Sequence, residues 1–548
     1  MPLDRCAQTQ NESPIGACSR GSRSLTPSAT DSFWGKNKEG LLTGAVLFLL
    51  VYSVIRNILM AAVRPFWFDE LCTWIVARQP NVSSIWHALK RAADSQPPPY
   101  YILERLFDKL IANDHIAFRM PSILAFCLME WCLFSLVKRR HNASVAFVAS
   151  LLPLVTVLYS TYAVEARPYC LVVAFLAAAL VAYQRLPSRI WTVLLGLSLA
   201  AAACSHYYAV FMTVLFLAVE AVHNLKTKSF RWPVWIALSF GFLPLIFFWP
   251  LLVRFKAYYS GHAWYGNPTL LGTLKFYAGV FGIFSAGPAS PSLPNLIVVL
   301  LAVAALVGAA LLIYRGLRAN PDEQPAFHLD ILAAGFLLSP VILLFATRIT
   351  HGGLAPRYLL PVVPGVALVA GFGLSFLSRK SLALIGALLC VGIASQETQF
   401  WLSYYGSYQL GFVISQPAVD LANSAGHADL PVVVSEGHDY LVLDHYTTPT
   451  WKQRFTFLAD PNAAVAYGKP DSNDKVLLML REFAPLRVIE YPQFKASHSQ
   501  FLLYSDPTWE NDPDWFVSWL SRDGWALHRL TTDGHSSVYL VTIETMPH

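Results

Sequence analysis

The stretch LLTGAVLFLLVYSVIRNILMAA, at residues 41–62, decides what kind of protein this is. An α-helix needs about 20 mainly apolar residues to cross the hydrocarbon core of a bilayer, and this stretch has that length and character. It is too long for the apolar core of a signal peptide, which has about 7–15 residues. Arg56 lies near one end, where its side chain can reach the polar interface. The sequence therefore predicts a membrane span here.

The composition of the whole chain agrees with this prediction. Charged residues make up 14% of the 548 residues, whereas a soluble protein has about 25%. Further apolar runs of similar kind follow, at 120–137, 143–160, 168–184, 190–204, 207–222, 233–252, 294–314, 328–347, 358–377 and 381–400. We therefore expect an all-α polytopic membrane domain of about eleven spans over residues 40–400. The Gly-rich run 270–286 is short and is expected to be re-entrant or interfacial, and the polar segment 1–39 is expected to be a disordered cytoplasmic tail.

The first external loop contains a segment that resembles a span but carries too much charge to be one. Residues 97–113 read PPPYYILERLFDKLIAN, with four charged side chains between Glu104 and Lys109. A charge at the centre of a span costs roughly 2.5–3.5 kcal/mol, so the four together cost on the order of 10 kcal/mol. We therefore assign this segment to one loop, 63–118, that lies on the membrane surface.

The cationic side chains between the spans indicate the orientation of the chain. With 97–113 left out and the amino terminus inside, every cluster falls on the cytoplasmic side, as the positive-inside rule requires. The clusters are Lys138–Arg140, Arg185 with Arg189, Lys226 with Lys228 and Arg231, Arg315 with Arg318, and Arg379 with Lys380. The sequence thus predicts a cytoplasmic amino terminus, an external carboxyl terminus and a bacterial inner membrane as the location.

The region 401–548 differs from the rest of the chain because its apolar runs have the length of strands. Such runs are PVVVS (431–435), RFTFL (454–458) and FLLYS (501–505). Residues 511–524 have helix signals, with Asp512 as N-cap, Pro513 at the first position and Gly524 past the end. Residues 525–543 read as two strands around a DGHSS turn. We expect a small external α/β domain.

Several classes of chemistry lack their usual signals in the sequence. No CxxC, HExxH, Walker or GxGxxG pattern in a usable context is present. No cysteine follows Cys390, so the external domain has no disulfide. The basic residues do not form a stripe with interleaved aromatic residues, which excludes nucleic acid as a partner. We expect no cofactor and no metal.

The motif WFDEL, at residues 67–71, is the sharpest candidate for a catalytic site. Two adjacent carboxylates beside aromatic residues are partly desolvated, which can raise a carboxylate pKa and strengthen it as a base. In a helix, neighbours point about 100° apart, so Asp69 and Glu70 cannot perform the same task. One carboxylate would face the reacting groups, and the other would orient the first carboxylate or pair with a cation. The alternative is that Asp69 only N-caps the following helix.

Three arginines at the external ends of spans are the second feature. Arg119, Arg167 and Arg357 could together hold a lipid phosphate, because guanidinium groups match phosphate geometry. Alternatively each is an interfacial anchor or the partner of a helix end, and Glu165 could be the structural partner of Arg167. His206 lies between spans among tyrosines, where membership of the aromatic belt is the alternative to a binding role.

Taken in their order along the chain, these motifs resemble those of the glycosyltransferase C (GT-C) superfamily. The resemblance is closest to the branch with protein O-mannosyltransferases and lipid A aminoarabinose transferases. The matching motifs are WFDE (67–70), QPPPYYILERLF (96–107), FRMPS (118–122), YSTYAVEARPY (159–169) and PRYLLPVVPG (356–365). The match covers residues 41–210 and, less fully, 350–370.

The resemblance implies an integral-membrane enzyme that transfers a sugar from a polyprenyl-phosphate donor to a hydroxyl of a lipid, glycan or protein on the external face. One base and a phosphate leaving group suggest inversion at the anomeric carbon. By resemblance, Asp69 is the catalytic base and Glu70 its partner. The donor phosphate would be bound by Arg119, Arg167 and Arg357, with support from Gln96, Tyr100, Glu165, Tyr169 and His206.

Two departures from the family and one competing function remain. Gln96 stands where the family often has His or Lys, and it cannot supply a positive charge to a phosphate. The loop 253–293 is too short for the large luminal insert of eukaryotic protein mannosyltransferases. A polytopic lipid or sugar transporter, or flippase, is the alternative function, and it would place charges near the middle of the spans.

Overall fold

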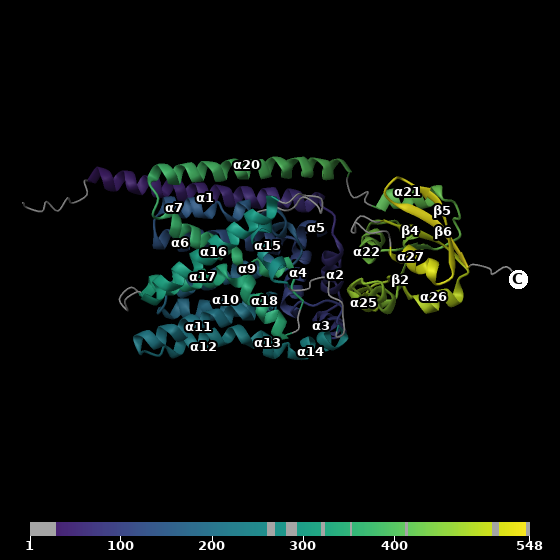
Figure 1. Cartoon of the computed structure of the whole chain (residues 1–548), viewed down its shortest axis with the longest axis horizontal. Helices are drawn as coiled ribbons and strands as arrows, with labels where there is room; N and C mark the ends of the chain where they lie inside the picture. Colours follow the sequence, from purple (N-terminus) through teal and green to yellow (C-terminus); the bar gives the residue numbers. More distant parts are fainter. Residues whose placement is uncertain are drawn as a thin grey trace, which may run out of the picture.

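Two long helices, α1 (Ala29–Val63) and α20 (Arg379–Leu410), lie side by side along one edge of the molecule (Figure 1). The computed structural model describes residues 29–259, 269–280, 293–318, 324–350, 353–410, 415–506 and 515–543. A helical domain forms one end of the molecule and an α/β domain the other, with the carboxyl terminus beyond the α/β domain (Figure 1).

The helical domain is built from short and long apolar helices. Its elements after the first loop are α6 (Met120–Arg140), α7 (Ala143–Ser150), η1 (Pro153–Val155), α8 (Val157–Ser160), η2 (Tyr162–Val164), α9 (Tyr169–Gln184), α10 (Arg189–Ser205), α11 (Ala209–Thr227), α12 (Trp232–Ser239), η3 (Phe240–Phe242), α13 (Leu243–Phe247), α14 (Trp249–Tyr258), α15 (Leu270–Gly279), α16 (Leu293–Arg318), α17 (Gln324–Leu337), α18 (Ser339–Thr350), η5 (Pro356–Leu359) and α19 (Val362–Leu374). Helices α6, α9 and α10 pack in sequence at its centre.

The number of spans is smaller than predicted when it is judged by helix length. Within the described residues, five helices are long and apolar enough to cross a membrane, or up to eight if each of three bent pairs is one span. A proline lies within three residues of each break: Pro153, Pro250 and Pro340. Because proline removes a backbone hydrogen bond, it bends the helix there.

The other predicted runs also form helices. The runs 168–184 and 190–204 become α9 and α10, which are too short for that length criterion, and 294–314 lies within α16. Part of the predicted re-entrant run 270–286 is α15, and residues 281–286 lie outside the described part of the chain. The chain is an integral membrane protein with a mostly helical polytopic domain.

Two predicted boundaries differ from the structure. Helix α1 begins at Ala29, inside the predicted tail, and residues 1–28 lie outside the described part of the chain. Helix α20 continues to Leu410, past the predicted domain boundary at 400. Extending a helix adds one hydrogen bond for each residue fixed, so a helix continues into polar sequence when no residue stops it.

Arg56 was predicted to extend to the polar interface, and in the structure its side chain is enclosed by protein. Its side chain is buried and pairs with Glu397 of α20 at 2.9 Å. The guanidinium lies over the ring of Phe400, 3.4 Å from its centroid, and 4.2 Å from that of Tyr159. A charge within the bilayer is costly unless it is paired, and α20 supplies the partner.

The first loop forms four short helices between α1 and α6: α2 (Phe68–Ala77), α3 (Val82–Lys90), α4 (Pro98–Leu110) and α5 (Asp114–Ala117). Helix α4 has 13 residues, too few to span a bilayer, as its charges predicted. Tyr100, Tyr101 and Glu104 are buried on one of its faces, whereas Leu106 and Leu110 are exposed. The loop thus covers the end of the helical domain that faces the α/β domain (Figure 1).

The carboxyl-terminal domain is α/β, as predicted. Its elements are α21 (Gln416–Ser424), β1 (Val432–Val434), α22 (Gly437–Tyr446), α23 (Pro449–Lys452), β2 (Phe455–Ala459), α24 (Pro461–Ala466), α25 (Ser472–Leu480), β3 (Val488–Glu490), α26 (Tyr491–Ser497), β4 (Gln500–Ser505), α27 (Trp515–Arg522), β5 (Trp525–Thr532) and β6 (Ser537–Ile543). The strands form one sheet in the order β3-β2-β1-β4-β6-β5.

The sheet register explains which strands the sequence revealed. Strands β1 to β4 pair in parallel, and Val433 of β1 is opposite Thr456 and Leu503. The antiparallel hairpin β5–β6 has the predicted turn, with Gly534 at φ 94°. Strand β3 was not predicted because its two apolar residues lie between Arg487 and Glu490, so no apolar run marks it. The predicted N-cap Asp512 lies outside the described residues, whereas Gly524 has φ 86°, as expected after a helix end.

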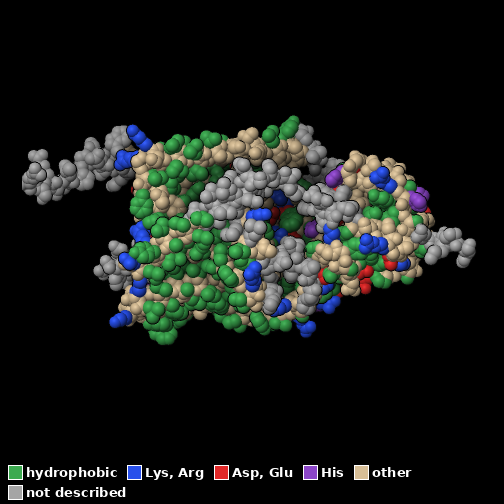
Figure 2. Space-filling model, in the orientation of Figure 1, with side chains coloured by type: hydrophobic (Ala, Val, Ile, Leu, Met, Phe, Trp, Pro, Cys, Tyr) green, Lys and Arg blue, Asp and Glu red, His purple; other side chains and the backbone are tan. Residues whose placement is uncertain are grey.

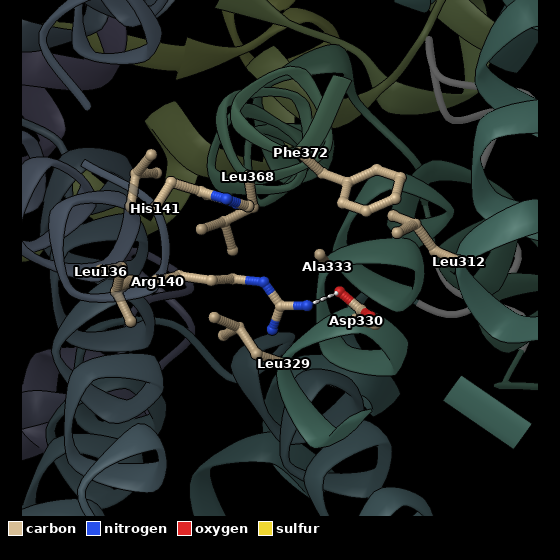
Figure 3. Close-up of a pocket in the computed structure, with 10 residues that line it drawn as sticks. Leu136, Arg140, His141, Leu312, Leu329, Asp330, Ala333, Leu368 and Phe372 are labelled. Carbon is tan, nitrogen blue, oxygen red and sulfur yellow. Dashed lines mark hydrogen bonds and ion pairs between the residues drawn. The ribbon is translucent and has the colours of Figure 1, made fainter. Parts of the chain in front are cut away.

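A group of Lys and Arg side chains lies at the end of the helical domain remote from the α/β domain (Figure 2). At that end, Arg140 pairs with Asp330 at 2.6 Å in a cavity lined by apolar side chains of α6, α16, α17 and α19 (Figure 3). Arg315 lies 3.7 Å from the same carboxylate. Because Asp330 offsets both cations, we interpret this cavity as structural. Arg119 and Arg140 lie at opposite ends of α6, and the 21 residues of this helix place the cavity about 30 Å from Arg119.

Candidate active site

The predicted catalytic motif forms the first turn of α2, which begins at Phe68 with Trp67 as the N-cap. The backbone N–H of Trp67 donates to the Glu70 carboxylate at 3.3 Å. A carboxylate in the first turn is also favoured by the partial positive charge of the helix N-terminus. The alternative interpretation of Asp69 as the N-cap is therefore wrong.

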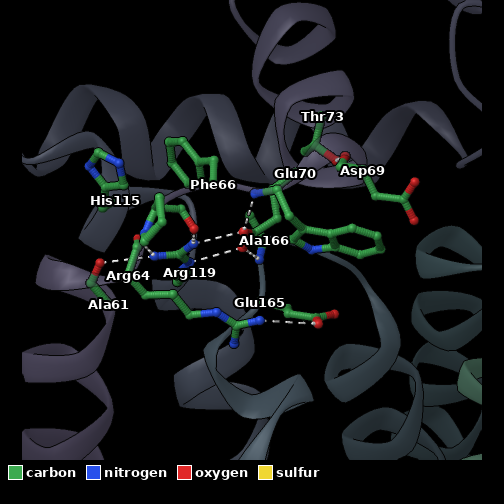
Figure 4. A network of polar contacts seen from close by, with 12 residues as sticks. Ala61, Arg64, Phe66, Asp69, Glu70, Thr73, His115, Arg119, Glu165 and Ala166 are labelled. Carbon is green, nitrogen blue, oxygen red and sulfur yellow. Dashed lines mark hydrogen bonds and ion pairs between the residues drawn. The ribbon is translucent and has the colours of Figure 1, made fainter. Parts of the chain in front are cut away.

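Glu70 is completely buried and is held by Arg119 in a two-point ion pair. Arg119 Nε lies 2.9 Å from Oε1 of Glu70 and Nη2 lies 2.7 Å from Oε2 (Figure 4). The backbone N–H of Ala166 donates to Oε1 at 2.7 Å. Burial alone would raise the pKa of Glu70. Arg119, Arg64 and the hydrogen bond from Ala166 lower this pKa by a larger amount, so its net shift is downward. Glu70 therefore joins α2, α6 and the segment before α9.

Arg119 has no donor left for a substrate. Besides its two bonds to Glu70, its Nη1 donates to the carbonyls of Ala61 and Arg64, and its Nη2 donates to that of Pro65. A guanidinium group has five N–H donors, and these bonds use all of them. In this structure Arg119 is a clamp that holds Glu70 and the backbone before α2, and its predicted role in binding a donor phosphate stays a prediction.

Asp69 points away from this clamp (Figure 4). Its carboxylate Oδ2 lies 3.3 Å from Arg357 Nη2 and 3.9 Å from Arg167 Nη2. Its side chain is 18% exposed, in contrast to 0% for Glu70. The structure therefore agrees with the expectation that the two neighbours have different tasks, and it brings Asp69 together with two of the three predicted arginines.

The electrostatic surroundings of Asp69 differ from those expected. Burial raises the pKa of Asp69, but the charges of Arg167, Arg357 and His438 together lower it below its usual value. The sequence suggested a raised pKa because it showed the aromatic neighbours but not the distant cations. In this state Asp69 is ionised and is a weak base.

Asp94 is a member of the site that the sequence analysis missed. Its Oδ2 accepts a hydrogen bond from Arg167 Nη1 at 2.9 Å. The same Nη1 also donates to Thr73 Oγ1 at 3.0 Å and to the Asp69 carbonyl at 3.2 Å. Asp94 lies two residues before Gln96, where the recognised motif QPPPYYILERLF begins. This position beside the motif was the only sign in the sequence that Asp94 belongs to the site.

The sequence suggested that Glu165 could be the structural partner of Arg167, but no ion pair joins the two side chains among the described contacts. The cation nearest to it is Arg64, at 3.9 Å (Figure 4). Oε2 of Glu165 is buried without a hydrogen-bond partner. Burial is the main cause that raises the pKa of Glu165 to about 7, with Arg64 opposing it. Glu165 therefore carries a proton in a large fraction of molecules at neutral pH.

A cavity next to Arg357 is lined by aromatic side chains. Tyr169, His206, Tyr208 and Tyr358 lie around it, and apolar residues of α9, α11, α18 and the link between η5 and α19 close its other walls. The ring of His206 is 4.9 Å from that of Tyr358. The predicted supporting residues Tyr169 and His206 thus lie beside Arg357.

His206 is a neutral hydrogen-bonding group in this cavity. Burial, together with the positive charges of Arg167 and Arg357, lowers the pKa of His206 to about 3. Its Nδ1 accepts a hydrogen bond from the backbone N–H of Tyr208 at 3.1 Å. In a neutral imidazole with Nδ1 as acceptor, the proton is on Nε2, which is a donor. His206 therefore offers a donor rather than a charge.

The other two predicted supporting residues lie behind the site. Gln96 is buried, and its amide donates to Ser95 Oγ at 3.2 Å. Tyr100 is buried on α4, where burial and Glu104 raise its pKa. No described contact joins either side chain to Asp69.

The α/β domain also reaches the site. The ring of His438, on α22, lies 4.7 Å from that of Phe68, the residue before Asp69. Figure 2 shows a hollow between the two domains, with acidic, basic and histidine side chains on its floor. The sequence contained no signal for His438, because the resemblance did not extend beyond residue 370. Within the described residues, no three His, Cys, Asp or Glu side chains are grouped as a metal site requires.

Comparison with known proteins shows a partial family match and a shared fold. Residues 95–253 match the family described as dolichyl-phosphate-mannose-protein mannosyltransferase. The crystal structure of ArnT from Cupriavidus metallidurans bound to undecaprenyl phosphate has the same fold, with a TM-score of 0.53 and 14% identity over 92% of this chain and 100% of that chain. The chain thus has the fold of ArnT, and about three tenths of its length matches the mannosyltransferase family model. In its apo state ArnT gives a TM-score of 0.54 at 14% identity, over 92% of this chain and 99% of that chain.

No curated protein matches this chain in sequence. The family match contains Arg119, Glu165 and Arg167, but it begins after Asp69 and ends before Arg357. The interpretation of the site residues therefore depends on the geometry described above.

Proposed function

We propose that this glycosyltransferase moves a sugar from a polyprenyl-phosphate donor to a hydroxyl acceptor at the external membrane face, with Asp69 as the base. The observation that carries the proposal is the position of the Asp69 carboxylate. It is partly exposed, 3.3 Å from Arg357 and next to an aromatic cavity of the membrane domain. The fold is that of ArnT, which was crystallised with undecaprenyl phosphate.

Arg357 and Arg167 are the residues that we assign to the donor phosphate. Arg357 lines the aromatic cavity and also faces Asp69, so it connects the place for a donor with the base. As the bond between the anomeric carbon and the phosphate oxygen breaks, negative charge grows on the phosphate. Fixed guanidinium groups stabilise this charge without any reorganisation during the reaction.

Donor binding would make Asp69 a stronger base. In the structure described here, Arg167 and Arg357 lower the pKa of Asp69 by electrostatic attraction. A bound phosphate would compete for these cations and reduce their effect on the carboxylate. The pKa of Asp69 would then rise, because burial still acts on it. The enzyme thus acquires its base when the donor is present.

The reaction then proceeds in one displacement. The acceptor oxygen forms a bond to the anomeric carbon as its proton moves to Asp69, and polyprenyl phosphate leaves with the electron pair of the broken bond. A positioned general base typically contributes 10²–10⁴-fold to such a rate. One attack from the face opposite the phosphate gives inversion, and product analysis that shows retention of the anomeric configuration would contradict this mechanism.

The orientation that we propose places the amino terminus in the cytoplasm and the α/β domain outside, in a bacterial inner membrane. The group of Lys and Arg side chains at the end remote from the α/β domain supports this orientation. The site with Asp69 lies at the opposite end, where the first loop meets α22.

The test is sugar transfer by purified protein in lipid nanodiscs. Radiolabelled undecaprenyl-phosphate sugars are supplied one at a time, together with a membrane extract as acceptor. We expect the wild-type protein to transfer label from one donor, and Asp69→Asn to be at least about 100-fold slower. Asp420→Asn, on the exposed face of α21, is the matched control and should keep full activity.

Two results would overturn the proposal. Full transfer by Asp69→Asn would remove Asp69 as the base. Absence of transfer with every donor, combined with movement of labelled lipid across proteoliposomes, would favour a flippase.

A further inference from the structure

The loop between α3 and α4 brings Asp94 against Arg167. Asp94 Oδ2 lies 2.9 Å from Arg167 Nη1, and the two side chains are only 8% and 5% exposed. Oδ1 of Asp94 accepts a hydrogen bond from the backbone N–H of Ser95 at 2.7 Å. Both carboxylate oxygens of Asp94 therefore have a donor, and one of these donors belongs to the main chain of its own loop.

Arg167 is held through one of its three guanidinium nitrogens. Besides its bond to Asp94, Nη1 donates to Thr73 Oγ1 at 3.0 Å and to the Asp69 carbonyl at 3.2 Å. The Thr73 hydroxyl donates to the same carbonyl at 3.2 Å. The backbone carbonyl of Arg167 accepts from Ser122 Oγ at 2.9 Å. Arg167 is thus fixed at its backbone and at Nη1.

The opposite edge of this guanidinium group, formed by Nε and Nη2, has no hydrogen-bond partner within the described residues. Nε is buried without a partner, and Nη2 lies 3.9 Å from Asp69 Oδ2, which is too far for a hydrogen bond. In Arg119, the same edge binds both carboxylate oxygens of Glu70 (Figure 4). A buried donor without a partner is unfavourable, so the open edge of Arg167 indicates a place for an anion with two oxygens.

We propose that Asp94 is a positioning residue for the donor. By fixing Nη1 of Arg167, it presents the Nε–Nη2 edge to the donor phosphate, which binds there through two oxygens. This inference rests on the proposed function, since it adds a residue to the phosphate end of the same site. Asp94 itself touches no substrate. The phosphate then lies beside the base, because Nη2 is the nitrogen of Arg167 that faces the Asp69 carboxylate.

A positioning residue and a simple counter-charge have opposite effects on phosphate binding. If Asp94 only neutralised Arg167, its removal would leave more positive charge at the site, and a phosphate would bind more tightly. If Asp94 fixes the orientation of the guanidinium group, its removal lets the group rotate, and the two-point contact is lost. The sign of the change in affinity therefore separates the two roles.

The first test measures equilibrium binding of radiolabelled undecaprenyl phosphate to the full-length protein in detergent micelles. We expect Asp94→Asn to raise the Kd by about 10-fold or more, because the amide NH2 group would face one of the two donors that Asp94 accepts from. The control Asp108→Asn removes another ion-paired carboxylate of the first loop and should leave the Kd unchanged. An equal or lower Kd for Asp94→Asn would overturn the proposal.

A second variant guards against misfolding. Asp94→Ala removes the carboxylate without placing an amide donor against another donor, and it should raise the Kd by a similar factor. Thermal unfolding in detergent shows which of the two variants is folded. An unchanged Kd in a folded Asp94→Ala protein would also overturn the proposal.

The third test asks whether Asp94 acts through Arg167. In Arg167→Lys the planar guanidinium fork is absent, so no edge remains for Asp94 to orient. In this background we expect Asp94→Asn to change the Kd by less than about 2-fold, whereas a residue that only supports the loop would cause the same loss in both backgrounds. Equal losses in the two backgrounds would refute the positioning role.

The outcomes distinguish this inference from the proposed function. If the wild-type protein transfers sugar and Asp94→Asn binds undecaprenyl phosphate as the wild type does, the inference fails and the proposed function stands. If the wild-type protein binds undecaprenyl phosphate but transfers no sugar, the proposed function fails, and the Kd values still decide the role of Asp94. If the wild-type protein does not bind undecaprenyl phosphate, both fail.

Discussion

The two neighbouring carboxylates of α2 show how one residue of sequence separates two environments. Glu70 is fully buried and its charge is matched by Arg119, whereas Asp69 is partly exposed and faces Arg357. The helix geometry that turns successive side chains by about 100° causes this difference. A site that needs both a rigid frame and a reactive group can therefore take them from adjacent positions.

Removing the charge of Glu70 is expected to destabilise the protein strongly. Glu70→Gln leaves Arg119 buried without its counter-charge, which typically costs about 3–5 kcal/mol of unfolding free energy. The control is Glu482→Gln, which breaks the exposed pair with Arg91 (2.5 Å) at a cost of about 0–1 kcal/mol. Thermal unfolding in detergent checks both variants. Equal melting temperatures for the two would contradict the clamp.

Glu165 is expected to make stability depend on pH. Burial raises the pKa of Glu165 from 4.5 to about 7, so the folded protein binds this proton more tightly than the unfolded chain does. The folded state therefore loses stability as pH rises from about 4.5 to about 7. Glu165→Gln removes this loss, so its melting temperature should match the wild type at pH 5 and exceed it at pH 8. A constant difference at both pH values would show that Glu165 is not the cause.

Several members of the site could be named from the sequence because they lie in motifs. Asp69 and Glu70 were recognised in WFDE, and the three arginines by their positions at span ends. Their division of labour could not be derived, because the bonds that occupy Arg119 come from carbonyls at Ala61 to Pro65, whose direction only the fold determines. Asp94 was missed because a single acidic residue in a loop has no distinguishing pattern.

At the level of elements, the packing of α19 against α17 depends on one glycine. A Cβ atom at Gly365 would overlap the backbone nitrogen of Leu337 and lie 2.6 Å from the carbonyl carbon of Phe336. Backbone atoms of a packed helix cannot move aside as a flexible side chain can. The two helices therefore approach closely only because this position lacks a side chain.

Gly365→Ala is thus expected to separate α17 from α19. Because η5 carries Arg357 directly before α19, the change should also displace Arg357 from Asp69 and lower activity. Gly373→Ala is the matched control, since nothing lies within 4 Å of a Cβ atom there. Melting temperature and sugar transfer are measured for both. Loss of stability in the control alone would refute the packing argument.

The elements themselves were largely predictable, and their lengths were not. Apolar composition identified every run that forms a membrane helix, and the charges of α4 excluded it as a span. The three bends were not foreseen, although Pro153, Pro250 and Pro340 lie beside them, because proline within the bilayer is often accommodated without a break. Strand β3 gave no apolar run, because its two apolar residues lie between Arg487 and Glu490.

At the level of the whole molecule, the two domains meet through polar contacts. Tyr446 of α22 accepts a hydrogen bond from the backbone N–H of Phe66 at 2.6 Å, and it lies 2.7 Å from His115 Nε2. Gln79 donates to the Phe483 carbonyl at 3.1 Å, and Arg91 pairs with Glu482. The α/β domain is therefore attached to the same first loop that carries Asp69.

Tyr446→Phe should loosen this attachment without unfolding either domain. The amide of Phe66 loses its acceptor, so its hydrogen exchange should become faster. Tyr467→Phe, in the same domain with no described contact to the helical domain, is the control. Exchange measured by mass spectrometry on peptides that contain Phe66 checks the prediction. Unchanged exchange in Tyr446→Phe would show that other contacts hold the domains.

The chain order of the site has a consequence for biosynthesis. Asp69 and its neighbour emerge early from the ribosome, Arg357 follows near the end of the membrane domain, and His438 comes later still. A nascent chain can close the Glu70–Arg119 clamp once α6 is inserted, yet it holds only part of the reactive centre. A chain made only as far as α6 could therefore hold Glu70 in its frame but would still lack Arg357, which lies 3.3 Å from Asp69 in the folded protein.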